Sequence, residues 1–354
     1  MTHVIRPVLV IILLFVCAVI PPNALSANKA EQPLMTTAQQ LFDPIPLTIP
    51  YPEGDFYFDE KIELGKLLFF DPRLSQSGNV SCHTCHNISL GGADGRSTSI
   101  GHQGRTGIRN SPTVFNSLFQ IAQFWDGRSR NLFEQAAGPM TGELEMATSD
   151  PQVCHLLSSV PGYVELFDEA FADRENPLCF TTIREALAAF ESTLITPNAT
   201  FDHFLRGADN ALNDKEKQGL ALFVELGCAT CHMGINVGGN GYYKFGVKKS
   251  PALKYRPVSD RGRQEIITTV EDDYVFKSPS LRNVSLTAPY FHSGSAWLLT
   301  EAVTVMADVQ LDKQLTLEQQ HLLVQFLKSL TGEQPHIVLP ALPPLSTLSP
   351  RPNS

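Results

Sequence analysis

Each half of the sequence contains one C-x-x-C-H motif, Cys82-His83-Thr84-Cys85-His86 in the first half and Cys228-Ala229-Thr230-Cys231-His232 in the second. A stretch of helical character with a Gly-x-x-x-Phe step precedes each motif. These stretches are Glu63-Leu64-Gly65-Lys66-Leu67-Leu68-Phe69 and Lys217-Gln218-Gly219-Leu220-Ala221-Leu222-Phe223. A duplicated module, with one unit in each half, explains both similarities. The sequence therefore predicts two related domains.

The C-x-x-C-H motif is typical of covalent attachment of c-type haem. Its two thiols add to the vinyl groups of the porphyrin, and the histidine after the second thiol lies beneath the iron. A zinc site fits less well, because 142 residues separate Cys85 from Cys228 and each cysteine pair has its own histidine. A redox-active C-x-x-C pair would need a βαβ context, which the sequence lacks. We therefore predict two covalent haems, attached through Cys82, Cys85, Cys228 and Cys231, with His86 and His232 as proximal iron ligands.

The group on the opposite side of each iron determines what a haem protein can do. His102 lies soon after the first motif in residues 91–107, a segment with six glycines that we expect to be a movable loop. Near the second haem, Met306 is the remaining methionine candidate. An iron with His/Met ligands has a high reduction potential and one with His/His ligands a low potential. The sequence therefore predicts electron flow between two unlike haems.

Composition and charge exclude several classes of protein. Of the 354 residues, 43% are hydrophobic and 18% are charged, as in globular proteins. The formal net charge of -9 argues against a nucleic-acid-binding protein, which needs a basic surface. Seven cysteines are too few for a disulfide scaffold. The chain is therefore expected to be a globular protein without a nucleic-acid partner.

The N-terminus predicts export. Arg6 precedes an apolar run of residues 8–20, which two prolines and the small-residue stretch Ala24-Leu25-Ser26-Ala27 follow. Such a run is short for a membrane span and suits a signal peptide, so we expect cleavage after Ala27 and no stable membrane insertion afterwards.

The rest of the chain is predicted to be mainly α-helical, with two cytochrome c-like domains. Capping boxes indicate helices that start near Thr182 and Thr316, and Asn213 is expected to cap the helix before the second motif. Pro197 is expected to stop the first of these helices. The predicted organisation is a signal peptide (1–27), a first haem domain (28–196), a second haem domain (197–332) and a Pro-rich tail over the surface (333–354).

Further motifs occur along nearly the whole mature chain. These motifs are Arg109-Asn110-Ser111-Pro112-Thr113, Trp125-Asp126-Gly127-Arg128, Glu134-Gln135-Ala136, Glu143-Leu144-Glu145-Met146, Leu281-Arg282-Asn283-Val284, Thr287-Ala288-Pro289-Tyr290-Phe291-His292 and Ala302-Val303-Thr304-Val305-Met306. In these stretches and in the haem motifs, the sequence resembles the bacterial dihaem cytochrome c peroxidase family, which also includes the MauG-type enzymes.

The resemblance implies roles for individual residues. His102 matches the removable distal ligand of the peroxidatic haem, Glu145 its acid/base residue, and Gln135 a neighbouring hydrogen-bonding amide. Trp125 matches the tryptophan between the haems. Met306 matches the distal methionine of the electron-entry haem, where MauG-type enzymes have tyrosine.

The resemblance also implies a calcium ion between the domains, near Asn110, Thr287 and Pro289. His292 matches a histidine close to the electron-entry haem. The implied activity is reduction of hydrogen peroxide to water in the periplasm, with electrons from a small cytochrome c or a copper protein (cupredoxin), by a protein expected to form homodimers. The alternatives are a MauG-like dihaem oxidase and a non-catalytic dihaem electron-transfer or sensor cytochrome.

Cys154 and Cys179 belong to none of these motifs. In an oxidising compartment they could close a loop of about 25 residues as a disulfide. The sequence alone leaves both the disulfide and the free thiols open.

Overall fold

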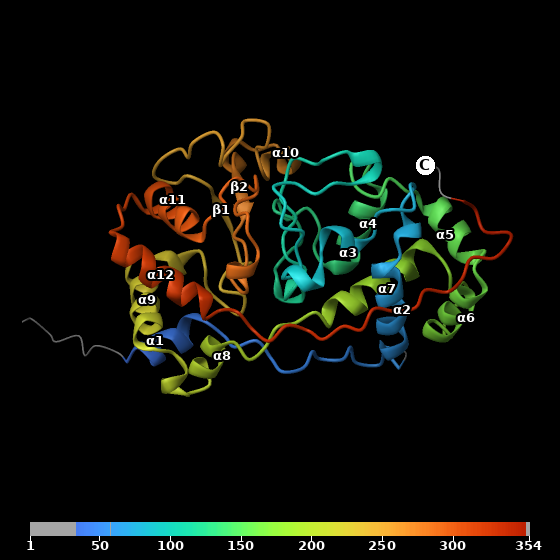
Figure 1. Ribbon diagram of the computed structural model, residues 1–354, viewed down its shortest axis with the longest axis horizontal. Coiled ribbons are helices and arrows are strands. Elements are labelled where there is room, and N and C mark those ends of the chain that lie inside the picture. The colour runs from blue at the N-terminus through green and yellow to red at the C-terminus, as the bar shows by residue number, and fades with distance from the viewer. Residues whose placement is uncertain (1–32, 57, 352–354) are drawn as a thin grey trace, which may run out of the picture. The chain divides into compact units, whose positions relative to one another are not determined.

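The computed structural model describes residues 33–56 and 58–351, and the predicted signal peptide lies outside these ranges. The described chain is mainly helical, as expected. Its only named strands are β1 (Tyr242–Lys244) and β2 (Val275–Lys277), which pair antiparallel. The helices, shown in Figure 1, are α1 (Leu34–Leu41), α2 (Phe58–Phe70), α3 (Cys82–Cys85), α4 (Leu132–Thr141), α5 (Asp150–Ser158), α6 (Pro161–Ala170), α7 (Phe180–Ser192), α8 (Thr200–Leu205), α9 (Asp214–Glu225), α10 (Gln264–Ile267), α11 (Leu299–Leu311) and α12 (Leu317–Lys328).

The two halves repeat one helix pair. In the first half, α2 packs on α7, and a Cβ atom at Gly65 would collide with the carbonyl oxygen of Ala186 on α7. In the second half, α9 packs on α12, and a Cβ atom at Gly219 would collide with the carbonyl oxygen of Leu322 on α12. Each Gly-x-x-x-Phe step thus begins with the glycine that lets two helix backbones approach closely.

The phenylalanine of each step completes the same contact. Phe69 packs against Phe190 of α7 with ring centroids 5.2 Å apart, and Phe223 packs against Phe326 of α12 at the same distance. Both pairs are tilted by about 60°, an arrangement favoured by the quadrupoles of the rings. The sequence repeat therefore corresponds to a repeat in packing.

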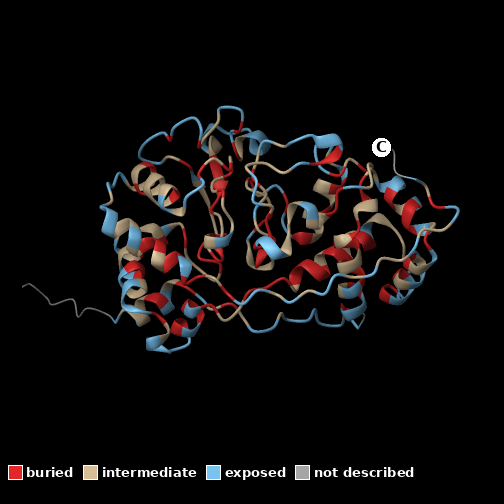
Figure 2. Cartoon of the chain, in the orientation of Figure 1, coloured by how far each residue is buried: buried red, intermediate tan, exposed pale blue. Residues whose placement is uncertain are grey.

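Separate hydrophobic clusters lie on either side of Pro197. One buried cluster draws its side chains from residues 64–194, and another draws on residues 201–330. Helix α1 contributes Ala38 to the second cluster, although it belongs to the stretch 28–196 that we predict as the first haem domain. Figure 2 shows the buried positions that run along α7, the central helix of the first cluster.

Three helix starts test the capping predictions. Asn213 caps α9, and Thr316 caps α12 with Gln319 as its partner, as expected. The prediction for α7 was wrong by one turn, because this helix begins at Phe180 with Cys179 as its N-cap. The Thr182 hydroxyl accepts a hydrogen bond from the Cys179 amide, so Thr182 closes the first turn instead of preceding it.

The described part of the Pro-rich tail, residues 333–351, contains no helix, as predicted. It runs along the first half of the chain (Figure 1). The carbonyl oxygen of Pro343 accepts a hydrogen bond from Arg73, and the Ser346 hydroxyl donates one to the carbonyl oxygen of Ser159. Among the described residues, no helix is long and apolar enough to cross a membrane.

Candidate haem and peroxide site

The first haem motif lines a cavity of about 170 Å³. Helix α3 presents Cys82 and Cys85 to this cavity, and His86 follows at the end of the helix. Burial lowers the pKa of His86, so its imidazole is held in the neutral form that ligates metals. Burial also raises the pKa of Cys85 to about 11. The residues present therefore fit a covalently attached haem with a histidine ligand.

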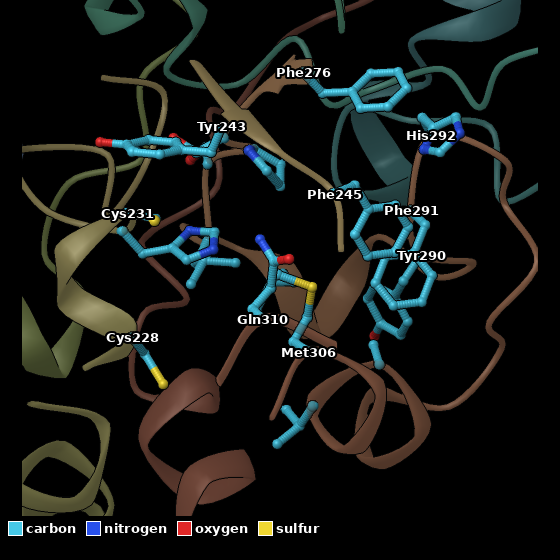
Figure 3. Close-up of a pocket in the computed structure, with 18 of the residues that line it drawn as sticks. Cys228, Cys231, Tyr243, Phe245, Phe276, Tyr290, Phe291, His292, Met306 and Gln310 are labelled. Carbon is cyan, nitrogen blue, oxygen red and sulfur yellow. The ribbon is translucent and has the colours of Figure 1, made fainter. Parts of the chain in front are cut away.

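The second haem motif lines a larger cavity of about 250 Å³, which also contains Met306. Figure 3 shows Cys228 and Cys231 on one side of this cavity, with Met306 reaching into the space from α11 and Phe245, Tyr290 and Phe291 beyond it. Burial lowers the pKa of His232 to about 4 and again keeps the imidazole neutral. A thioether and an imidazole that line one apolar cavity suit a haem with His/Met ligands.

Glu145 and Gln135 line the first cavity and not the second. Gln135 lies on α4, and Glu145 lies in the segment between α4 and α5, where it is exposed to the cavity. Surrounding protein atoms raise the pKa of the Glu145 carboxyl group, and the charge of Arg128 partly opposes this shift. A raised pKa makes a carboxyl group a better proton acceptor than an ordinary exposed carboxylate.

His102 lies beside Glu145 but is not among the described residues that line the first cavity. The His102 amide donates a hydrogen bond of 2.6 Å to the Glu145 carbonyl oxygen, and the His102 side chain is 5% exposed. The neighbouring Gly101 has no room for a Cβ atom, because one would collide with the backbone carbonyl of Leu144. In this structure the loop therefore packs against the Glu145 segment and leaves Glu145 facing the cavity.

One wall separates the two cavities. Trp125 lines both of them, and its indole Nε1 donates a hydrogen bond of 2.8 Å to the carbonyl oxygen of Asn110. His292, on the side of the second cavity, lies edge-on to the Trp125 ring at a centroid distance of 6.3 Å. The residues that line both cavities are Asn110, Ser111, Pro112, Thr113, Phe124 and Trp125.

The residues expected near calcium share one cavity. Asn110, Thr287 and Pro289 all line the second cavity. The Asn110 side-chain nitrogen donates a hydrogen bond of 2.8 Å to the Arg96 carbonyl, an orientation that leaves its amide oxygen to accept. In the described ranges, no group of three or more His, Cys, Asp or Glu residues forms a metal cluster. A calcium ion here would depend on amide, backbone and water oxygens, which Ca²⁺ accepts.

Three charged residues that the sequence analysis did not single out also face the cavities. Arg128 lines the first cavity beside Glu145, and Glu191 of α7 lines it with a pKa that burial raises to about 8. Lys277 lines the second cavity, and burial lowers its pKa to about 7 although Asp126 acts in the opposite direction. Its ammonium group donates hydrogen bonds to Gln120 and to the carbonyl oxygen of Ala122. Only Arg128 had a signal in the sequence, since it ends the Trp125-Asp126-Gly127-Arg128 motif.

Comparisons with known proteins identify the family of the chain. A family model described as di-haem cytochrome c peroxidase matches residues 59–210. The chain is 47% identical over 315 residues to cytochrome c551 peroxidase of Pseudomonas aeruginosa, an alignment that covers 89% of this chain and 91% of that protein. It is 39% identical over 253 residues to the methylamine utilization protein MauG of Methylorubrum extorquens, with 70% and 69% covered.

A solved structure shows the same fold. A MauG-like protein associated with microbial copper homeostasis superposes with a TM-score of 0.71 at 28% identity, and the match covers 82% of this chain and 95% of that one. The alignment with the Pseudomonas aeruginosa peroxidase covers about nine tenths of both chains. The chain therefore belongs to the di-haem cytochrome c peroxidase family and is an enzyme of the cytochrome c peroxidase type.

Proposed function

We propose that this peroxidase reduces hydrogen peroxide to water at the first cavity and receives electrons at the second, from a small periplasmic cytochrome c or a cupredoxin. The asymmetry between the cavities carries the proposal. Glu145 and Gln135 line only the first cavity, and Met306 lines only the second. One cavity offers acid/base and hydrogen-bonding groups, whereas the other offers a soft sulfur ligand.

Haem supplies the redox chemistry at both sites, and the protein supplies position and protons. Cleavage of the O–O bond requires transfer of a proton from the inner to the outer oxygen of peroxide. The Glu145 carboxyl group would perform that transfer, because the surrounding protein raises its pKa and Glu145 lines the cavity. The Gln135 amide, on the same cavity wall, would orient the peroxide oxygens through hydrogen bonds.

The wall between the cavities is the proposed route for electrons. Trp125 lines both cavities, and its hydrogen bond to Asn110 fixes the indole between them. Met306 would hold the second iron at a high potential, since a thioether stabilises ferrous iron better than an imidazole does. His102 would act as the removable ligand of the first iron. Its buried position beside Glu145 is compatible with a loop that can move away and leave the cavity open.

Calcium is proposed at the same wall, through Asn110, Thr287 and Pro289. These residues come from both halves of the chain, so a bound ion would couple the loop after His102 to the second cavity. The predicted signal peptide supports a periplasmic location, where donors of this kind occur.

Turnover with hydrogen peroxide and a reduced small cytochrome c tests the proposal. The holoprotein should oxidise two donor molecules for each peroxide consumed. The non-catalytic alternative predicts no peroxide-dependent oxidation of the donor, whether the protein starts oxidised or half-reduced.

A further inference from the structure

Two cysteines of the first half lie outside both cavities. Cys154 is on α5, Cys179 caps the N-terminus of α7, and both are half-buried free thiols. Helices α5 and α7 are in contact, and Cys154 packs against the same hydrophobic cluster as Leu178 and Phe180, the two neighbours of Cys179 in the chain. Neither cysteine lines the cavities that contain the haem motifs. This pair therefore needs an explanation of its own.

The surroundings of the two sulfur atoms shift their pKa values in opposite directions. Burial alone would raise the pKa of Cys179, but the amide and hydroxyl groups of Thr181 and Thr182 outweigh it and lower that pKa. The sulfur lies 3.6 Å from the Thr182 hydroxyl. A helix N-terminus that presents amide hydrogens to a sulfur favours its thiolate, which is the nucleophilic form.

Cys154 has the opposite environment. Its thiol donates a hydrogen bond of 3.3 Å to the Asp150 carboxylate. Burial, this hydrogen bond and the negative charges of Asp150 and Cys179 together raise its pKa to about 12. Cys154 therefore keeps its proton while Cys179 gives its proton up more easily. Such a division suits one attacking sulfur and one resolving sulfur.

We propose that Cys154 and Cys179 form a peroxide-sensitive thiol pair that closes into a disulfide between α5 and α7. The Cys179 thiolate attacks one oxygen of hydrogen peroxide, the O–O bond breaks, and the leaving hydroxide takes a proton to become water. Cys154 then attacks the resulting sulfenic acid, and its thiol proton leaves with the displaced hydroxide as a second water. Two thiols and one peroxide give one disulfide and two waters.

The disulfide would affect the first half of the chain. It would join the start of α7, the helix that carries Glu191 to the first cavity, to α5, which follows the Glu145 segment. A thiol reductant would reopen it by exchange. The inference rests on the proposed function only in taking hydrogen peroxide as the oxidant that this protein encounters.

The test uses the holoprotein, reduced with a phosphine, freed of reductant and treated with excess hydrogen peroxide without an electron donor. Remaining thiols are then alkylated under denaturing conditions, and peptides are mapped by mass spectrometry. We expect a cross-linked peptide that contains Cys154 and Cys179, with parallel loss of alkylation at both. Because no donor is added, the outcome does not depend on peroxidase turnover.

Two variants separate the roles of the sulfur atoms. Cys154→Ser should leave a sulfenic acid at Cys179 that dimedone traps, and Cys179→Ser should slow oxidation of Cys154 at least tenfold. Both variants should keep the donor-dependent peroxide turnover of the parent protein. Full alkylation of Cys154 and Cys179 after peroxide treatment would overturn the proposal, as would equal oxidation of Cys154 with and without Cys179.

Discussion

Arg109 donates hydrogen bonds of 2.7 Å to both carboxylate oxygens of Asp260, which lies 151 residues further along the chain. The same guanidinium group also pairs with the buried carboxylate of Asp126. Arg109 directly precedes Asn110, the residue that accepts the hydrogen bond of Trp125. The bidentate pair therefore fixes the wall between the two cavities to the second half of the chain.

Replacement of Asp260 by Asn should destabilise the protein by about 3 kcal/mol at pH 7, because it removes one partner of a buried ion pair. Burial raises the pKa of Asp260, but the hydrogen bonds and charge of Arg109 outweigh it and the pKa is lowered. The stabilisation is thus present above the unfolded pKa near 3.8 and is lost as the pH falls through the folded value. Urea unfolding from pH 7 to pH 3 should show the gap between parent and variant narrowing below about pH 4. A gap that is constant with pH would contradict this assignment.

Replacement of Glu145 by Gln should lower peroxide turnover about a hundredfold, the loss typical of an acid/base residue. The haem spectrum should hardly change, because the amide keeps the shape of the carboxyl group. Glu143→Gln is the matched control, since Glu143 is exposed two residues away and lines neither cavity. Near-normal turnover in Glu145→Gln would remove this residue from the mechanism.

Replacement of Trp125 by Phe should slow electron transfer between the haems and leave the first cavity able to bind peroxide. The change keeps an aromatic ring in the wall but removes the hydrogen bond to Asn110, a loss of about 1 kcal/mol in stability. Stopped-flow absorbance on half-reduced protein measures the rate. The only other tryptophan in the sequence, Trp297, is 57% exposed and supplies the control Trp297→Phe, which should behave as the parent. Equal rates in the two variants would argue against a route through Trp125.

Calcium removal should impair activation more than folding. If Asn110, Thr287 and Pro289 hold the ion, elemental analysis should find one calcium per chain, and Asn110→Ala should lose it. Chelation should then slow interhaem electron transfer with little change in helical circular dichroism. Unchanged activity and electron transfer after exhaustive chelation would show that this wall needs no calcium.

The haem motifs and the helical stretch that precedes each of them could be predicted because their signals are local. Gly65 and Gly219 mark close helix contacts, and the chain itself repeats the pattern. The start of α7 was misplaced because Thr is a preferred N-cap residue and Cys is not, yet the fold places Cys179 at the cap. The Arg109–Asp260 pair depends on contact between distant segments, which no short sequence pattern records.

The loop around His102 likewise makes contacts with a distant segment that its own sequence does not record. Its glycines predicted a movable loop, but not that His102 would lie buried with its amide bonded to the Glu145 carbonyl. Which side chains face a cavity depends on packing between segments, so Glu191 and Lys277 also escaped prediction.

The division of labour between the cavities is tested most directly by the reduction potentials of the two haems in Met306→His and in the parent protein. Redox titration of the parent should resolve one high and one low potential. The variant should keep the low potential and lose the high one, and its donor-dependent peroxide turnover should fall although Glu145 and Gln135 are intact. A variant that retains a high-potential haem and normal turnover would contradict the assignment of the second cavity as the site of electron entry.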